Sequence, residues 1–458
     1  MTYRNMKGEQ ISHEMHKLIP GGSHTYSKGD DQFPCNAPKV MSRAKGAYCW
    51  DVDDNKYLDW AMGNRVMSLG HAKDHVDNLV FEAVRNGANF TRPGILEYQL
   101  AEYLTDHWPC AEMVKFGKNG SDVVTAAVKL ARAYTGRPYV LICGSHPFFS
   151  IHDWFIGSTE MNSGTLQSER HYTVKFIYGD KDSVEAAFEQ HKGQIAALIL
   201  EPVKNDSPYA DPRADDLTQA GMNRHGDNTD NFLLYLRKKT ESEGAMLIFD
   251  EMIAGMRFGS RGAHYHYGIW PDLVTFGKAI SNGYSCSVLA GKREIMNLGG
   301  INHDRERVFL LSQTHGSETV GLAATLATMR YYEERDIESH IWKIGSHLKL
   351  SVREAIDAHD MAQHVRIIGF DANPQILCTD EAGSYWPELH TLFHQYVVAE
   401  NVLIPWITIT EAHGLAEVKY TTEVIDRAIG RLREDMSKKR VTEKLMSDPV
   451  KPVFRKFN

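Results

Sequence analysis

Three charged side chains stand where apolar, strand-like segments of the sequence end. Glu201 follows AALIL, Asp250 follows AMLIF and Lys278 follows LVTFG. In open parallel sheets, ligands bind beyond the carboxyl ends of the strands. A lysine held in an apolar mouth can form a Schiff base with an aldehyde, and a buried carboxylate requires a cationic or hydrogen-bonding partner. Each residue also has a structural interpretation: Lys278 as a lysine leaving a helix start, and Asp250 as a helix cap.

An anion site is a further candidate, at the start of KNGSDVVTAAVKLARAYTGR, residues 118–137. Apolar residues from Val124 to Tyr134 fall at helical spacing, and Gly120 and Ser121 precede them. A helix N-terminus with free N–H groups and a hydroxyl can bind phosphate. Helix capping explains the same residues equally well.

The segment PFFSIHDW, residues 147–154, places two aromatic side chains after an expected strand. Core packing is the default interpretation of such residues. A flat ring, here that of Phe148, can instead stack on a planar cofactor.

Together these features fit one ligand, pyridoxal 5′-phosphate. Its aldehyde matches Lys278, its basic ring nitrogen matches Asp250, and its phosphate matches Gly120 and Ser121. In this interpretation Asp250 stays ionised by pairing with the pyridinium N–H, which keeps the ring an electron sink.

Two other catalytic classes are weakly supported. Gly-Lys occurs at 117–118 and 277–278, but neither pair has the earlier glycine and the following Ser or Thr of a phosphate loop. The sequence HYH at 264–266 suggests a metal-dependent hydrolase, yet no carboxylate or further His stands at ligand spacing. We therefore predict no metal site.

Composition limits the partners and the compartment. The chain of 458 residues has a formal net charge of -8, which argues against nucleic acid or an anionic membrane as a partner. No run of 18 apolar residues is present, so no membrane span is predicted. The six cysteines lie far apart without a CxxC pair, as reduced thiols do in a cytoplasmic protein.

Alternating strand and helix patterns predict an α/β fold. Near-continuous apolar strands with helices between them indicate a mostly parallel sheet covered on both faces. The expected strands are 113–117, 139–144, 173–179, 195–202, 245–252, 273–279 and 287–292.

Three regions are expected along the chain. Residues 1–95 form an N-terminal helix, an irregular arm and a hairpin at 46–60 that belongs to a smaller domain. Residues 96–325 form the large domain, with a polar loop insertion at 204–230. Residues 326–458 form a small α+β domain, with a helix at 318–337 leading into it, strands near 365–379 and helices near 385–400 and 420–440.

The sequence LIFDEMIAGMRFG…YGIWPDLVTFGKAISNG resembles the signature of the class III (ω-type) aminotransferases. The wider chain is most similar to their glutamate-1-semialdehyde aminomutase-like branch, from about residue 15 to 435. The resemblance implies the fold of fold-type I PLP-dependent transferases, with Lys278 as the Schiff-base lysine and Asp250 as the partner of the pyridinium. Gly120 and Ser121 stand in the place of the family's phosphate turn.

The same resemblance implies roles for four further residues. Glu201 would lie near the cofactor ring, Ile253 close to its face, and Phe148 where the family has a stacking tyrosine. Thr314, in SQTHGSE, matches the residue that reaches the phosphate of the neighbouring subunit. A homodimer with shared active sites is therefore expected.

One departure from the family concerns the substrate. The aminomutases carry an arginine six residues after a Gly-Gly pair, where this chain has Lys28 in GGSHTYSK. Arg and Lys are not interchangeable in holding a carboxylate. With His24 in the same polar arm, this favours transfer of an amino group from an amino acid to a polyhydroxylated aldehyde or ketone. The alternatives are an intramolecular aminomutase and a binding protein that has kept the fold without catalysis.

Overall fold

The computed structural model describes residues 6–145, 148–203, 205–209 and 231–457. The chain divides into two compact units. The smaller comprises Met1–Lys73 and Ser339–Arg455, and the larger comprises Asp74–Glu338 with Lys456–Asn458. The predicted insertion at 204–230 lies mostly outside the described residues.

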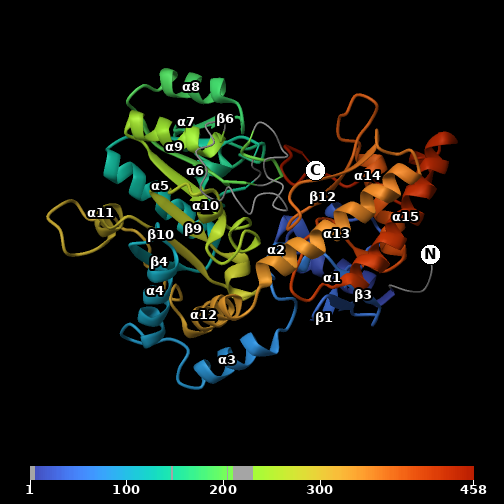
Figure 1. Cartoon of the computed structure of the whole chain (residues 1–458), viewed down its shortest axis with the longest axis horizontal. Helices are drawn as coiled ribbons and strands as arrows, with labels where there is room; N and C mark the ends of the chain where they lie inside the picture. Colours follow the sequence, from blue (N-terminus) through green and yellow to red (C-terminus); the bar gives the residue numbers. More distant parts are fainter. Residues whose placement is uncertain (1–5, 146–147, 204, 210–230, 458) are drawn as a thin grey trace. The chain divides into compact units, whose positions relative to one another are not determined.

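A seven-stranded sheet forms the centre of the larger unit (Figure 1), in the order β4-β10-β9-β8-β7-β5-β6. From β9 to β6 all neighbours are parallel, whereas β10 is antiparallel to both β9 and β4. The mostly parallel sheet predicted from the sequence is confirmed. The strands are β4 Met113–Gly117, β5 Tyr139–Cys143, β6 Thr173–Phe176, β7 Ile195–Leu200, β8 Met246–Asp250, β9 Leu273–Phe276 and β10 Ser287–Gly291.

Helices flank this sheet, as the all-buried strands require. Every residue of β7 is buried, because a central parallel strand is covered on both faces. Gly136 ends α5 with a φ of 67°, the left-handed conformation expected of a helix C-terminal glycine. The helices are α3 Asp74–Val84, α4 Ile95–His107, α5 Gly120–Thr135, α6 Asp153–Ile156, α7 Gln167–His171, α8 Lys181–Gln190, α9 Phe232–Glu243, α10 Gly262–Tyr267, α11 Arg293–Met296 and α12 Thr319–Glu334, with 3-10 turns η6 Gly255–Arg257, η7 Lys278–Ser281 and η8 Asn297–Gly299.

The smaller unit is α+β, with a four-stranded sheet ordered β1-β2-β3-β13 and a two-stranded sheet of β11 and β12. The hairpin expected at 46–60 is present as β2 and β3. Its elements are α1 Met6–Leu18, η2 Tyr26–Lys28, η3 Asp30–Gln32, β1 Met41–Lys45, β2 Tyr48–Asp51, β3 Lys56–Asp59, α2 Met62–Arg65, most of α13 Ile337–Ala358, β11 Val365–Ile368, β12 Gln375–Cys378, α14 Pro387–Ala399, β13 Val402–Leu403, α15 Leu415–Ser437 and η9 Thr442–Lys444.

The structure differs from the sequence prediction in two elements. Strand β1 forms within the segment that was predicted to be an irregular arm. It is stabilised by antiparallel pairing with β2, which the residues of β1 alone do not indicate. Helix α13 was not predicted, although Ile341, Ile344 and Leu348 bury one face at helical spacing.

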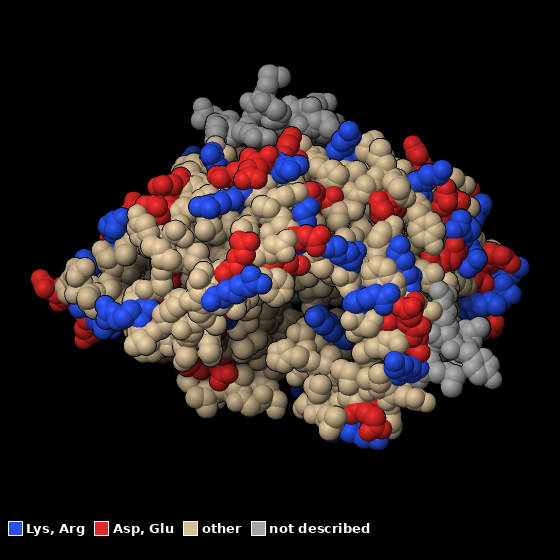
Figure 2. Space-filling view, turned by 90° about the horizontal axis from the view of Figure 1, so that it is seen from below, with Lys and Arg blue, Asp and Glu red and all other residues tan. Residues whose placement is uncertain are grey.

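The chain divides after Lys73 and after Glu338, whereas the sequence predicted boundaries after residues 95 and 325. Helices α3 and α12 pack against each other within the larger unit, so residues 74–95 and 326–338 belong to it. No described helix is both long and apolar enough to cross a bilayer. On the face in Figure 2, Lys and Arg side chains are interspersed with Asp and Glu rather than gathered in a patch of one sign.

Two histidines of α14 lie in the interior of the smaller unit, where His394 is buried and His390 is half-buried. The rings of His390 and His394 lie 4.4 Å apart, and His390 Nδ1 and His394 Nε2 have no hydrogen-bond partner in the described structure. Burial lowers the pKa of His390 to about 4 and that of His394 well below its usual value of 6.5. Both rings are therefore neutral at pH 7.

This burial predicts an acid sensitivity. Since the unfolded chain binds the proton near pH 6.5 and the folded chain only near pH 4, stability is full above pH 6.5 and is lost as the pH falls. For His390 the whole loss is about 3 kcal/mol. Urea unfolding of the apoprotein between pH 7 and pH 4.5 should show a shallower loss for His390→Leu than for the unchanged protein. Equal pH slopes would contradict the assignment.

Candidate active site

The carboxyl end of β8 holds a buried acid. Asp250, the last residue of β8, is 2% exposed and lies opposite Thr275 on β9. Its Oδ1 accepts hydrogen bonds from Met252 N at 3.0 Å and Thr275 Oγ1 at 3.4 Å. Both bonds end on the same oxygen, which leaves Oδ2 able to accept a hydrogen bond from a ligand.

A second buried carboxyl stands beside the first. Glu201 follows β7, the strand that pairs with β8, and is also 2% exposed. Burial and, to a smaller extent, the charge of Glu201 raise the pKa of Asp250, the Lys278 ammonium opposes them, and the resulting pKa is about 7. The sheet edge thus brings together the three charged residues predicted from the sequence, two acids and one amine.

Lys278 occupies an unusual backbone conformation. Gly277 ends β9, and Lys278 starts η7 with a φ of 48°. Few non-glycine residues adopt this region, and such strain is concentrated at functional sites. The lysine is half-buried at the point where the strand emerges.

Met252 fills a gap between two glycines. A Cβ at Gly277 would come within 2.6 Å of Met252 Sδ, and a Cβ at Gly120 within 3.0 Å. The end of β9 and the start of α5 therefore both approach one thioether. Ile253, the residue expected from the family resemblance, is its half-buried neighbour.

The first turn of α5 is held from two sides. Ser121 is 5% exposed, and its Oγ accepts a hydrogen bond from Ile151 N at 3.1 Å. On the other side Lys118 Nζ donates to Ser285 O at 3.0 Å and forms an ion pair with Glu318. Lys118 is thus already paired, so an anion at this point would be bound by the start of α5 itself.

The two aromatic side chains near 148 have different environments. Phe149 is 2% exposed and belongs to the core, whereas Phe148 is 41% exposed and meets Phe155 edge-on with 5.7 Å between ring centroids. Ser150, which follows them, is fully buried. Of the two rings, Phe148 is the one that can face a ligand.

Three predicted residues lie on exposed segments. Thr314 is exposed, and its carbonyl accepts a hydrogen bond from Asn89 Nδ2 at 2.9 Å in the larger unit. His24 and Lys28 are exposed in the N-terminal segment of the smaller unit, where Lys28 ends η2.

Sequence reasoning missed Thr275, Met252 and Ser150. Thr275 reads only as a strand residue until β9 is paired with β8. Nothing in the sequence indicates a role for Met252, because the two glycines that it contacts are distant along the chain. The departure from the family at Phe-Phe-Ser was visible, but the contacts of Ser150 were not.

Comparison with known proteins decides the family. The aminotransferase class-III family matches residues 26–371, about three quarters of the chain. A glutamate-1-semialdehyde 2,1-aminomutase of Acetivibrio thermocellus is 32% identical over 351 residues, which cover 75% of this chain and 77% of the relative. The chain belongs to the class III aminotransferases.

Other members of the class III family are similar over nearly the full length. A 3-aminobutyryl-CoA aminotransferase of Cloacimonas acidaminovorans is 28% identical, covering 93% of this chain and 95% of the relative. The structure of the FumI protein of Sphingopyxis sp. MTA144 matches with a TM-score of 0.82 at 24% identity, over 97% of this chain and 98% of that one. An ω-transaminase of Sphaerobacter thermophilus matches with a TM-score of 0.80 at 22% identity, over 94% and 99%. The fold is that of fold-type I PLP-dependent transferases.

Class III aminotransferases are pyridoxal 5′-phosphate enzymes, and the site fits this cofactor. Asp250 is a buried acid with both of its hydrogen bonds on Oδ1, and a pyridinium N–H would bring a positively charged donor to Oδ2. The helix start at Gly120 and Ser121 suits a phosphate group. The protein is therefore a PLP-dependent enzyme.

The buried carboxylate of Asp250 should lower the free energy of unfolding of the apoprotein. Its pKa is about 7 when folded and 3.8 when unfolded, so the cost is absent below pH 3.8 and complete above pH 7. We expect apo Asp250→Asn to be more stable than the unchanged protein by up to about 4 kcal/mol at pH 8. The difference should narrow to about 2 kcal/mol at pH 5. Denaturant unfolding measures both values.

Asp272 provides the matched control. It is 3% exposed next to the same sheet, but its carboxylate binds Arg237 at 2.9 Å and Lys292 at 2.5 Å. Asp272→Asn should destabilise the protein, because it removes the charge that pairs with the largely buried Arg237 side chain. Destabilisation by both substitutions would show that Asp250 also has its charge satisfied by the protein.

Proposed function

We propose that the protein transfers an amino group from an amino-acid donor to a polyhydroxylated aldehyde or ketone of the sugar or sugar-phosphate class. The observation that carries the transferase chemistry is the meeting of Lys278 with Asp250 and Glu201 at the carboxyl ends of neighbouring strands. When bound, the cofactor supplies an aldehyde for covalent capture of amines and a ring that accepts electrons.

Lys278 has two tasks in this proposal. Its Nζ would hold the cofactor through the aldehyde. As a free amine, Nζ would remove and return the proton on the substrate carbon that carries the amino group, as general base and acid. A half-buried lysine next to two acids suits both tasks.

The remaining site residues would hold the cofactor. Asp250 would accept the ring N–H on Oδ2, and Glu201 would add negative charge beside it. Ser121 Oγ and the N–H of Gly120 would donate to the phosphate. Phe148 would stack on the ring, and Ile253 would lie near its face.

The choice of acceptor depends on His24 and Lys28. A lysine ammonium is a compact donor that suits hydroxyl and phosphate oxygens, whereas a bidentate carboxylate favours arginine. Among the relatives are both an aminotransferase acting on a CoA compound and aminomutases. An intramolecular aminomutase is therefore the second candidate. A transaminase requires an external amino donor and a mutase does not, which separates the two.

The test is a transamination assay. Purified enzyme with glutamate as donor should aminate at least one member of a panel of keto- and aldo-sugars and their phosphates. Lys278→Ala should abolish turnover, because no other described amine stands at the end of β9. Product formation from glutamate-1-semialdehyde without any donor, and none from the panel, would favour the mutase.

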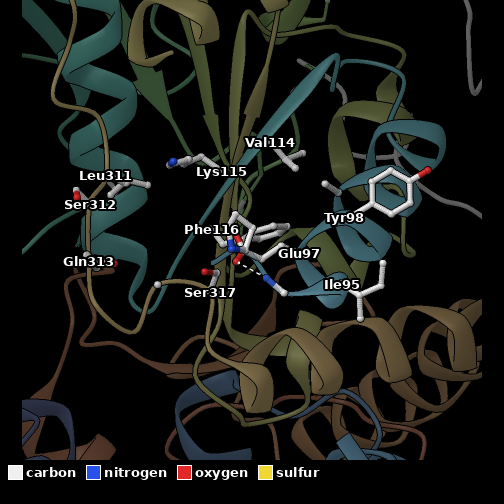
Figure 3. A pocket seen from close by; sticks show the side chains of 14 residues that line it. Ile95, Glu97, Tyr98, Val114, Lys115, Phe116, Leu311, Ser312, Gln313 and Ser317 are labelled. Atoms are coloured by element: carbon white, nitrogen blue, oxygen red, sulfur yellow. Dashed lines mark hydrogen bonds between the residues drawn. The ribbon is translucent and has the colours of Figure 1, made fainter. Parts of the chain in front are cut away.

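We further propose that a second copy of the chain completes the site. A groove of about 830 Å³ runs beside α4, β4 and residues 311–317 (Figure 3). Ile95 and Tyr98 at this groove are 66% and 59% exposed. Thr314 lies in the same loop, and on a dimer it would reach the phosphate held by the partner subunit.

A charge next to the exposed Ile95 and Tyr98 side chains should separate the subunits. Glutamate is favoured at a helix start, so Ile95→Glu leaves α4 intact while placing a charge in the interface. We expect it to convert a dimer into a monomer in sedimentation analysis and to weaken PLP binding. Leu166→Glu, at a residue 64% exposed elsewhere on the larger unit, should remain dimeric. An unchanged Ile95→Glu dimer would exclude this surface.

A further inference from the structure

A chain of hydrogen bonds runs from Trp154 to the first turn of α5. Trp154 Nε1 donates to Thr125 Oγ1 at 2.8 Å, Thr125 Oγ1 and Ser150 Oγ are 2.9 Å apart, and Ser150 Oγ donates to Ser121 O at 3.4 Å. Trp154 and Ser150 are almost fully buried. Thr125 and Ser121 are four residues apart on α5, so they share one face of the helix.

The chain has a defined donor at one end. An indole N–H only donates, so Thr125 Oγ1 is the acceptor in its bond with Trp154. Either hydroxyl can donate in the bond between Thr125 and Ser150, and Ser150 Oγ also accepts His152 N–H at 3.1 Å. Thr125 and Ser150 thus connect the buried indole and the loop at 150–152 with the first turn of α5.

The same loop determines the role of the Ser121 hydroxyl. Ser121 Oγ accepts from Ile151 N at 3.1 Å, which is the one hydrogen bond the described structure gives this atom. Because an acceptor contact occupies a lone pair, the hydroxyl proton remains free to donate to an anion at the start of α5. Ser150 anchors the neighbouring Ile151 through its own hydrogen bonds to Thr125 and Ser121. The chain of hydrogen bonds from Trp154 through Thr125 and Ser150 to Ser121 is called the relay below.

We propose that Thr125 and Ser150 are positioning residues that orient the Ser121 hydroxyl as a donor to the cofactor's phosphate. They act through Ser121 and the loop 150–152 and do not touch the cofactor themselves. This inference rests on the proposed phosphate site. It adds to that site a buried relay that ordinary helix capping does not require.

The test compares Thr125→Val and Ser150→Ala with two controls. Thr125→Ser keeps the relay hydroxyl. Thr135→Val removes a hydroxyl from the last turn of the same helix, where Thr135 Oγ1 donates to Ala131 O at 2.7 Å. Three quantities are measured for each: the PLP dissociation constant, the ³¹P resonance of the bound phosphate, and the melting temperature of the apoprotein.

Thr125→Val and Ser150→Ala should each weaken PLP binding by about 3- to 10-fold, the value of one hydrogen bond, and shift the ³¹P resonance. Thr125→Ser should match the unchanged protein, and Thr135→Val should leave both PLP readouts unchanged. Lower melting temperatures with an unchanged dissociation constant and ³¹P resonance would overturn the inference. Failure of the unchanged protein to bind PLP would instead overturn the proposed phosphate site.

Discussion

The site depends on two carboxyl groups buried at one edge of a parallel sheet. Asp250 and Glu201 are both 2% exposed at neighbouring strand ends, and the Lys278 ammonium opposes the rise in the pKa of Asp250 that burial and Glu201 cause. Keeping carboxylates away from water is costly unless positive charge or hydrogen bonds stabilise them. In the proposed function, the pyridinium N–H of PLP would add to that stabilisation at Asp250.

Close backbone approach is the second constraint. Gly277 and Gly120 come from distant parts of the chain, and both face Met252. A side chain at either position would meet the Met252 side chain, which would have to move. The two glycines thus allow the amine of Lys278 and the start of α5 to belong to one site, which matches a cofactor with an aldehyde at one point and a phosphate at another.

The substrate question involves the other unit. His24 and Lys28 lie on an exposed polar segment of the smaller unit, whereas the residues proposed to hold the cofactor all belong to the larger one. In the proposed function, the amino-transfer chemistry is assigned to the sheet edge and the choice of acceptor to this polar segment.

The sequence by itself determined the parallel sheet, the seven strand positions and the charged residues at three strand ends. These follow from local patterns, because a doubly covered strand must be apolar throughout and a polar residue at its end is conspicuous. Only the tertiary structure decided that Thr275 supports Asp250, that Met252 fills the gap between two glycines, and that Ser150 connects a loop to α5. Those contacts join residues that are far apart along the chain. Neither the residue types nor their spacing in the sequence indicates which residues will be in contact.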